Sequence, residues 1–236
     1  MKLTIKGFVD VSLVDWDGKI SSVVFLPNCN LRCPFCQNAK LVLHPEELPT
    51  ISFEEITERL AKIKKWIDGV VITGGEPTLH LDLPLFCRKL KDLGFKVKLD
   101  TNGTNPRVLQ KLIEEELIDY VALDVKAPLN EQKYSEATGV KTEKLLKEII
   151  NSINLLQNGK VDYEFRTTVV PTFHTAEDMV EIAKSIEGAK LFVLQQFNPD
   201  NTLDPKLGKV EPYSREELEE IAKECKPFVS KVKVRA

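Results

Sequence analysis

The stretch SVVFLPNCNLRCPFC, residues 22–36, joins a nearly continuous apolar run to a loop that carries three cysteines. A short run of this kind is typical of a strand buried on both faces, as in a parallel sheet. The runs VVIT at 70–73 and FVL at 192–194 have the same character. The sequence therefore predicts a parallel sheet, with a chemically unusual loop directly after one of its strands.

Apolar strands and amphipathic helices alternate along the rest of the chain. The predicted strands are residues 22–27, 69–73, 95–100, 119–125, 161–170 and 191–197. The predicted helices are residues 53–66, 82–93, 106–116, 141–157, 175–187 and 214–225. Ser52 and Glu55 form a capping-box pattern at the start of the first helix. Repeated strand-then-helix units predict an α/β fold with a parallel sheet covered by helices.

The two ends of the chain differ from this repeating pattern. Residues 1–20 predict a short hairpin that precedes the repeating units. Residues 198–213 are rich in Pro, Asn and Asp, so they predict a loop, and the segment 201–236 adds a last helix and strand. We find no internal repeat and expect one domain, with residues 21–200 as its main part.

Composition narrows the class of protein. The chain has 236 residues, of which 42% are hydrophobic and 29% charged, with a net charge of −3. This mix suits a folded globular protein. The slightly acidic balance argues against nucleic-acid binding. No apolar run reaches the roughly 18 residues of a membrane span. Asp10 and Asp15 interrupt any signal-peptide core, so we expect a cytoplasmic protein.

Five cysteines offer the first chemical indication. Cys29, Cys33 and Cys36 lie within eight residues, a spacing that lets three thiolates reach three corners of an iron–sulfur cube. The alternative is a zinc site, with His44 or a distant cysteine as fourth ligand. Cys87 and Cys225 each lie in a helical row of apolar residues, so we expect both in the core.

Polar loops follow the next three strands, at the strand ends where α/β proteins carry their sites. They are Gly74-Gly75-Glu76-Pro77, Asp100-Thr101-Asn102-Gly103 and Asp124-Val125-Lys126. Taken singly, the first could be a tight turn and the last a solvated loop. Their succession in strand order favours a shared site.

The loop CNLRCPFC, followed by GGEP after the next strand, resembles the radical S-adenosylmethionine enzymes over essentially the whole chain. The segments SLVDWDGKISSVVFLPNCNLRCPFCQN, GGEPTL, FKVKLDTNGTNP and VDYEFRTTVVP are similar to activating enzymes for glycyl radical proteins. LDTNG and DYVALDVKAP are especially similar to the short activases of anaerobic ribonucleoside-triphosphate reductase. Asn28 stands where a glycine is usual, Gln37 where a histidine is common, and Asp17 where a proline is common.

The resemblance implies a partial (βα)6 TIM-type barrel and a set of residue roles. Cys29, Cys33 and Cys36 would hold a [4Fe–4S] cluster whose fourth iron is chelated by S-adenosylmethionine. The other implied cofactor-binding residues are Phe35 at the adenine, Gly74, Gly75 and Glu76 at the methionine amino group, Asp100, Thr101, Asp124 and Lys126 at the ribose and carboxylate, and Arg166 with the Thr168 backbone.

The implied reaction is reductive cleavage of S-adenosylmethionine to a 5′-deoxyadenosyl radical, which abstracts hydrogen from a glycine of anaerobic ribonucleotide reductase. Such an oxidoreductase would take its electron from a flavodoxin or ferredoxin type donor, and its partner would be the reductase itself. The cofactor carries this chemistry, so no side chain needs to act as an acid or base.

Three alternatives remain at this stage. The substrate could be pyruvate formate-lyase, or a small molecule, as for 7-carboxy-7-deazaguanine synthase. A non-catalytic metal-binding or electron-transfer protein is the third, and it would not cleave S-adenosylmethionine. The remaining ionisable groups carry simpler predictions. We expect surface or packing roles for His44, His80 and His174, and a solvated helix face for the lysines at 62, 64 and 65.

Overall fold

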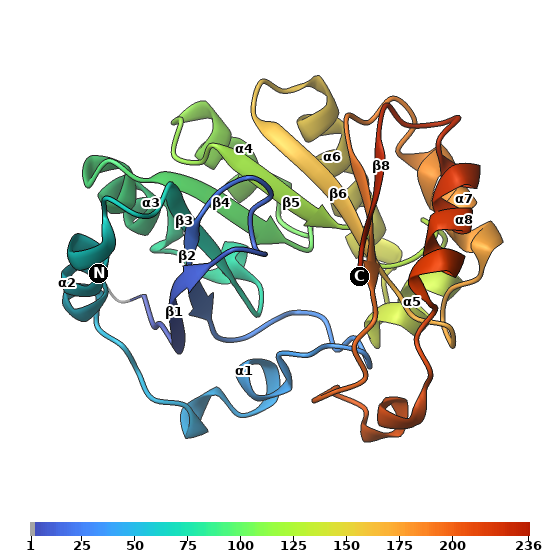
Figure 1. The fold of residues 1–236 in the computed structure, drawn as a ribbon, viewed down its shortest axis with the longest axis horizontal. Helices are drawn as coiled ribbons and strands as arrows, with labels where there is room; N and C mark the ends of the chain where they lie inside the picture. The colour runs from blue at the N-terminus through green and yellow to red at the C-terminus, as the bar shows by residue number, and fades with distance from the viewer. Residues whose placement is uncertain (1–2) are drawn as a thin grey trace. The chain divides into compact units, whose positions relative to one another are not determined.

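The computed structural model describes residues 3–236 (Figure 1). These residues divide into two compact units. The first unit comprises the described residues up to Asn30, together with Lys40–Thr101 and Arg107–Val121. The second comprises Leu31–Ala39, Asn102–Pro106 and Ala122–Ala236. The first two residues of the predicted N-terminal extension lie outside the described part. Each unit is therefore assembled from segments that are distant in sequence.

The first unit begins with two strands and two helices, and after these, strands and helices alternate. Its elements are β1 (Gly7–Ser12), β2 (Ser21–Leu26), α1 (Ala39–Leu43), α2 (Phe53–Ile63), β3 (Gly69–Gly74), α3 (Leu83–Asp92), β4 (Lys96–Thr101) and α4 (Pro106–Glu114). The chain passes from the first unit to the second within β5 (Tyr120–Asp124). The second unit then contains α5 (Glu131–Thr138), α6 (Glu143–Asn158), β6 (Asp162–Val169), α7 (Ala176–Ser185), β7 (Phe192–Gln196), α8 (Arg215–Cys225) and β8 (Val232–Arg235).

Within the first unit, β2, β3 and β4 are parallel neighbours, and β1 runs antiparallel to β2. The predicted N-terminal hairpin thus uses β2 as its second strand. Val23 lies opposite Val71, and Val24 opposite Ile72, and all four side chains are fully buried. Burial on both faces explains why these strands are almost entirely apolar.

The first predicted helix shows how its ends are fixed. The Ser52 side chain accepts a hydrogen bond from the Glu55 backbone N–H at 3.0 Å, so α2 begins where the sequence predicted. The Glu55 carboxylate lies 3.7 Å from Arg59, one turn further on. The helix ends at Ile63, three residues earlier than predicted.

Within the second unit, β6, β7 and β8 are parallel neighbours, and α8 packs against α7 and β8. Helix α5 was not predicted, because its sequence EQKYSEAT has few apolar residues. Both of its ends are capped. The Asn130 side chain accepts a hydrogen bond from the Lys133 backbone N–H at 2.9 Å, and Gly139 follows the last turn in the left-handed conformation, with a φ of 67°. These are the usual helix start and stop residues.

Parallel strands followed by helices confirm the predicted α/β class, and they agree with the predicted partial TIM-type barrel. The predicted core positions of Cys87 and Cys225 are confirmed as well, since both side chains are fully buried. Burial raises the pKa of each of these thiols to about 12, which makes them unreactive. In the described residues, no helix is long and apolar enough to cross a membrane.

Candidate functional site

The predicted site residues are divided between the two units. Those in the first unit are Cys29, Gly74, Gly75, Glu76, Asp100 and Thr101. Those in the second unit are Cys33, Phe35, Cys36, Asp124, Lys126, Arg166 and Thr168. In the described residues, none of the five cysteines forms a disulfide.

The glycine pair after β3 packs against the end of β2. A Cβ atom added at Gly75 would lie 1.9 Å from the Asn28 carbonyl oxygen, and one at Gly74 would lie 2.4 Å from the Leu26 oxygen. The Gly75 N–H donates to Leu26 at 2.8 Å, and the Glu76 N–H donates to Asn28 at 2.7 Å. The two glycines therefore allow the turn to hold the backbone that leads into Cys29, one residue later.

Asn28 itself explains one departure from the family pattern. Its φ of 66° lies in the left-handed region. In that region glycine is favoured, and asparagine is among the side chains best tolerated. The position therefore still has the backbone conformation that a glycine would supply, and the Asn28 carbonyl accepts the Glu76 N–H.

Glu76 is fully buried, and one of its carboxylate oxygens accepts three hydrogen bonds. The donors to Oε1 are the Thr78 N–H at 3.0 Å, the Thr78 hydroxyl at 2.6 Å and the Thr101 hydroxyl at 2.8 Å. The sequence-predicted residues Glu76 and Thr101 are thus brought together from the ends of β3 and β4.

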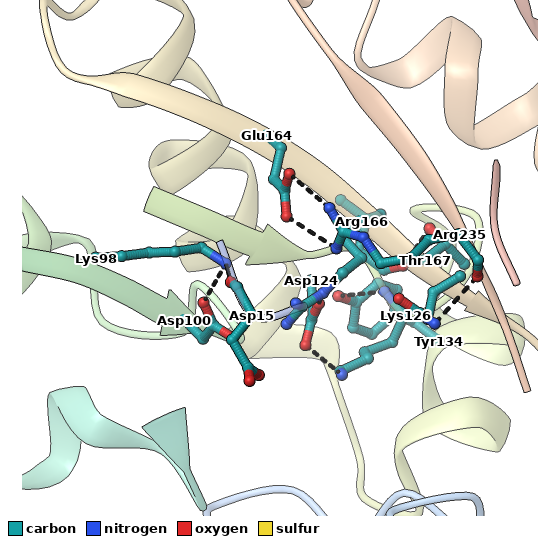
Figure 2. A network of polar contacts seen from close by, with 12 residues as sticks. Asp15, Lys98, Asp100, Asp124, Lys126, Tyr134, Glu164, Arg166, Thr167 and Arg235 are labelled. Carbon is teal, nitrogen blue, oxygen red and sulfur yellow. Dashed lines mark hydrogen bonds and ion pairs between the residues drawn. The ribbon is translucent and has the colours of Figure 1, made fainter. Parts of the chain in front are cut away.

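Asp100, at the end of β4, faces a lysine that sequence analysis did not select. Lys98 is 1% exposed, and its ammonium lies 3.1 Å from the Asp100 carboxylate (Figure 2). The same ammonium donates to the Asp15 carbonyl oxygen at 2.5 Å. Lys98 therefore links β4 to the turn that follows β1. The sequence shows only a lysine two residues before a strand-end aspartate, and its burial is known from the structure alone.

In the second unit, the cysteine loop is held by segments that follow it in sequence. The Arg32 N–H donates to Thr138 at the end of α5 at 2.8 Å, and the Asp204 N–H donates to Pro34 at 2.8 Å. The Cys36 N–H donates to the Cys33 carbonyl at 3.0 Å, which closes a turn between these two cysteines. Helix α5, missed from the sequence, is thus one of the supports of the loop.

Asp124, Lys126 and Arg166 form a cluster of charged side chains in the second unit (Figure 2). The Asp124 carboxylate accepts from Arg166 Nε at 2.6 Å and from Lys126 Nζ at 2.9 Å. Burial alone would raise the pKa of Asp124, but the two cations outweigh it and hold that pKa well below its usual range. Burial opposes the charge of Lys126 too, but the negative charges of Asp124 and Cys33 raise its pKa above the usual value. The Asp124 carboxylate and the two cations therefore stabilise one another in their charged forms.

Phe35, between two of the cysteines, is buried against two aromatic rings. Its ring centroid lies 5.7 Å from that of Phe173 and 6.1 Å from that of His174, which it meets edge-on. These two contacts fix the position of the Phe35 ring. Thr168, another predicted site residue, lies in β6 opposite Gln195 of β7.

The three histidines have the surface and packing roles that were predicted. His44 is exposed, beside Glu46 at 3.5 Å. His80 Nε2 lies 2.8 Å from the Pro27 carbonyl oxygen. His174 is fully buried, and burial lowers its pKa to about 4.

The family model described as "Radical SAM superfamily" matches residues 23–186. The chain therefore belongs to the radical SAM superfamily, whose cofactors are a [4Fe–4S] cluster and S-adenosylmethionine, as the sequence predicted.

Its relatives include activating enzymes. A putative glycyl-radical enzyme activating enzyme of Methanocaldococcus jannaschii is 38% identical over 236 residues, covering 100% of this chain and 97% of that protein. The pyruvate formate-lyase-activating enzyme of Clostridium pasteurianum is 26% identical, covering 95% of this chain and 98% of that protein. Streptococcus suis SuiB bound to S-adenosylmethionine has the same fold, with a TM-score of 0.67 at 15% identity, covering 91% of this chain and 52% of that one.

The donor set of this chain fits the family's cofactors. Three cysteine side chains on one loop are the ligands that an iron–sulfur cluster requires, and the buried thiols Cys87 and Cys225 leave that loop as the soft-ligand site.

Proposed function

We propose that this chain is a glycyl radical enzyme activating enzyme that acts on a glycine of an anaerobic ribonucleotide reductase. The observation that carries the proposal is the similarity along the full length of the chain to a putative glycyl-radical enzyme activating enzyme. The reductase, as the particular target, is supported by the segments LDTNG and DVKAP, residues 99–103 and 124–128.

A protein substrate is also supported by apolar side chains exposed on the N-terminal hairpin. Val9 and Val11 on β1 are 41% and 48% exposed, and Leu13 and Val14 in the following turn are 71% and 72% exposed. Exposed apolar residues that are grouped on a surface are one feature of protein interaction sites. We assign this strip, Val9 to Val14, to contact with the partner protein.

The roles of the site residues follow from the cofactors of the family. Cys29, Cys33 and Cys36 would ligate the cluster, and Phe35 would lie against the adenine. Gly74, Gly75 and Glu76 would meet the methionine amino group. The remaining contacts, to the ribose and carboxylate, would come from Asp100, Thr101, Asp124, Lys126, Arg166 and the Thr168 backbone.

When bound, the cluster and S-adenosylmethionine supply a 5′-deoxyadenosyl radical by reductive cleavage of a carbon–sulfur bond. The side chains of this chain bind and orient. Because the pKa of Lys126 is raised and that of Asp124 is lowered, both stay charged throughout the physiological pH range. Lys126 can therefore pair with a carboxylate without any proton transfer.

We further propose a flavodoxin or ferredoxin type electron donor, and a division of the chain into the hairpin extension 1–20, the barrel 21–200 and the closing segment 201–236. The C-terminal segment holds no second cysteine cluster, since its one cysteine, Cys225, is buried in α8. We therefore propose no ligands for a second iron–sulfur cluster within residues 201–236.

The test is electron paramagnetic resonance of the cognate reductase after anaerobic incubation with the reduced, reconstituted protein and S-adenosylmethionine. The proposal predicts a glycyl radical signal that is lost when the reductase glycine is changed to Ala. Cleavage of S-adenosylmethionine without a reductase signal would favour pyruvate formate-lyase or a small molecule as substrate. No cleavage at all would favour the non-catalytic alternative.

A further inference from the structure

Both backbone polar groups of Lys126 are bonded to buried aromatic side chains that sequence analysis did not select. The Lys126 N–H donates to the Tyr134 hydroxyl oxygen at 3.2 Å, and His174 Nε2 lies 2.8 Å from the Lys126 carbonyl oxygen (Figure 2 shows Tyr134 and Lys126). Tyr134 and His174 are both fully buried. Because β5 ends at Asp124, side chains take the place of strand hydrogen bonds at this residue.

The hydrogen bonds of His174 define its tautomer. The Val170 N–H donates to His174 Nδ1 at 3.0 Å, so Nδ1 must be the unprotonated nitrogen. The proton of the neutral ring is then on Nε2, which donates to the Lys126 carbonyl. The backbone around the ring is also fixed, because the His174 N–H donates to Val170 at 2.8 Å and the Tyr213 hydroxyl donates to the His174 carbonyl at 3.0 Å.

This arrangement connects two loops that carry predicted site residues. From the Lys126 backbone, the side chain reaches the Asp124 carboxylate at 2.9 Å. From the other side of the His174 ring, an edge-on contact reaches Phe35, which lies between Cys33 and Cys36. A shift of the Lys126 backbone would therefore move its ammonium away from Asp124.

We propose that Tyr134 and His174 are positioning residues that clamp the Lys126 backbone, and so place the Lys126 ammonium for the carboxylate of S-adenosylmethionine. This inference rests on the proposed role of Lys126. It assigns to Tyr134 and His174 no contact with the cofactor. Their contribution is to remove the freedom of a loop that lies beyond the end of its strand.

The test compares substitutions that keep or remove single hydrogen bonds. Tyr134→Phe removes one oxygen atom, and its matched control is Tyr163→Phe, since the buried Tyr163 hydroxyl also accepts a backbone N–H, that of Lys190 at 3.4 Å. His174→Gln can keep a donor near the Nε2 position, whereas His174→Asn can keep only an acceptor near Nδ1. Lys126→Ala is the reference for loss of the ammonium.

Two measurements are made on each variant. The first is equilibrium binding of S-adenosylmethionine to the reconstituted, unreduced protein. The second is hydrogen exchange of the Lys126 amide in the cluster-free chain, which reports the clamp without any cofactor. We expect Tyr134→Phe and His174→Asn to weaken binding about three- to tenfold, the effect of one lost hydrogen bond. Tyr134→Phe should also accelerate Lys126 exchange, while His174→Gln and Tyr163→Phe stay near the parent protein.

Several results would overturn the inference. Unchanged binding and exchange in Tyr134→Phe, together with weak binding in Lys126→Ala, would show that the clamp has no effect. If His174→Gln and His174→Asn lose S-adenosylmethionine affinity equally, while hydrogen exchange of the Lys126 amide stays normal, the role of His174 would be limited to its local turn with Val170. Normal binding in Lys126→Ala would instead refute the proposed role of Lys126, and the exchange data would still decide whether the clamp exists.

Discussion

Asp124 offers the sharpest test of the charge cluster, because one carboxylate neutralises two cations. Its side chain is 20% exposed, and those of Lys126 and Arg166 are 16% and 18% exposed. In Asp124→Asn, the two cations would face each other without a counter-charge. Breaking a fully buried ion pair costs about 3–5 kcal/mol, and partial exposure reduces this, so we expect a loss of about 2–3 kcal/mol. For a chain of this length that corresponds to a Tm lowered by about 5–10 °C.

The assay is thermal unfolding of the chain without its iron–sulfur cluster, with Glu115→Gln as the matched control. Glu115 forms an exposed pair with Arg88, with side-chain exposures of 36% and 51% respectively. Loss of such an exposed pair should cost less than about 1 kcal/mol. The pKa of Asp124 is lowered in the folded protein, so its contribution is fully present above the unfolded pKa of about 3.9 and is lost as the pH falls from there toward the folded pKa. A Tm for Asp124→Asn equal to that of Glu115→Gln at neutral pH would refute this account of the cluster.

Three further predictions address the cluster ligands, the buried histidine and the exposed strip. Cys33→Ala should lose bound iron and S-adenosylmethionine cleavage, whereas Cys87→Ala should keep both. Iron analysis of the anaerobically reconstituted protein and an assay of cleavage measure the two properties, and a normal iron content in Cys33→Ala would contradict the ligand assignment. Folding lowers the pKa of His174 from about 6.5 to about 4, so the unfolded chain binds a proton at this residue that the folded protein does not. The free energy of unfolding should therefore fall by up to about 3 kcal/mol as the pH is lowered between these values. Urea titrations should show a smaller loss in His174→Gln. The pair Leu13→Glu and Val14→Glu should reduce radical formation in the partner while 5′-deoxyadenosine production without the partner is unchanged; full radical transfer would remove the strip from the proposed interface.

The alternation of strands and helices was predictable because each buried strand is apolar on both faces and each long helix has an apolar row. Cys87 illustrates this, since the row Leu83, Phe86, Cys87 and Leu90 is buried as its spacing predicts. Helix α5 was not predictable in the same way. Tyr134 and Ala137 are among its few apolar residues, so its evidence in the sequence is limited to the caps Asn130 and Gly139.

The residues of the polar loops were selected because they follow strand ends, and Arg166 and Thr168 were selected from the family resemblance. The residues that support them were not selected. Lys98, Tyr134 and His174 were not selected, because their roles depend on contacts that form only in the folded chain, such as that of Lys98 with the Asp15 carbonyl. His174, for example, meets the Lys126 carbonyl 48 residues away. The glycine pair was ambiguous between a ligand cradle and a tight turn, and the close approach of Gly75 to Asn28 gives it a packing role that spacing alone does not reveal.

Transfer of a labelled hydrogen atom tests the central claim most directly. The cognate reductase would be prepared with α-deuterated glycine, incubated with the reduced protein and S-adenosylmethionine, and the 5′-deoxyadenosine analysed by mass spectrometry. Abstraction from a backbone glycine moves one deuterium from the α-carbon to the 5′ carbon, so the account predicts singly deuterated 5′-deoxyadenosine. Unlabelled 5′-deoxyadenosine, formed at the same rate with and without the reductase, would contradict it.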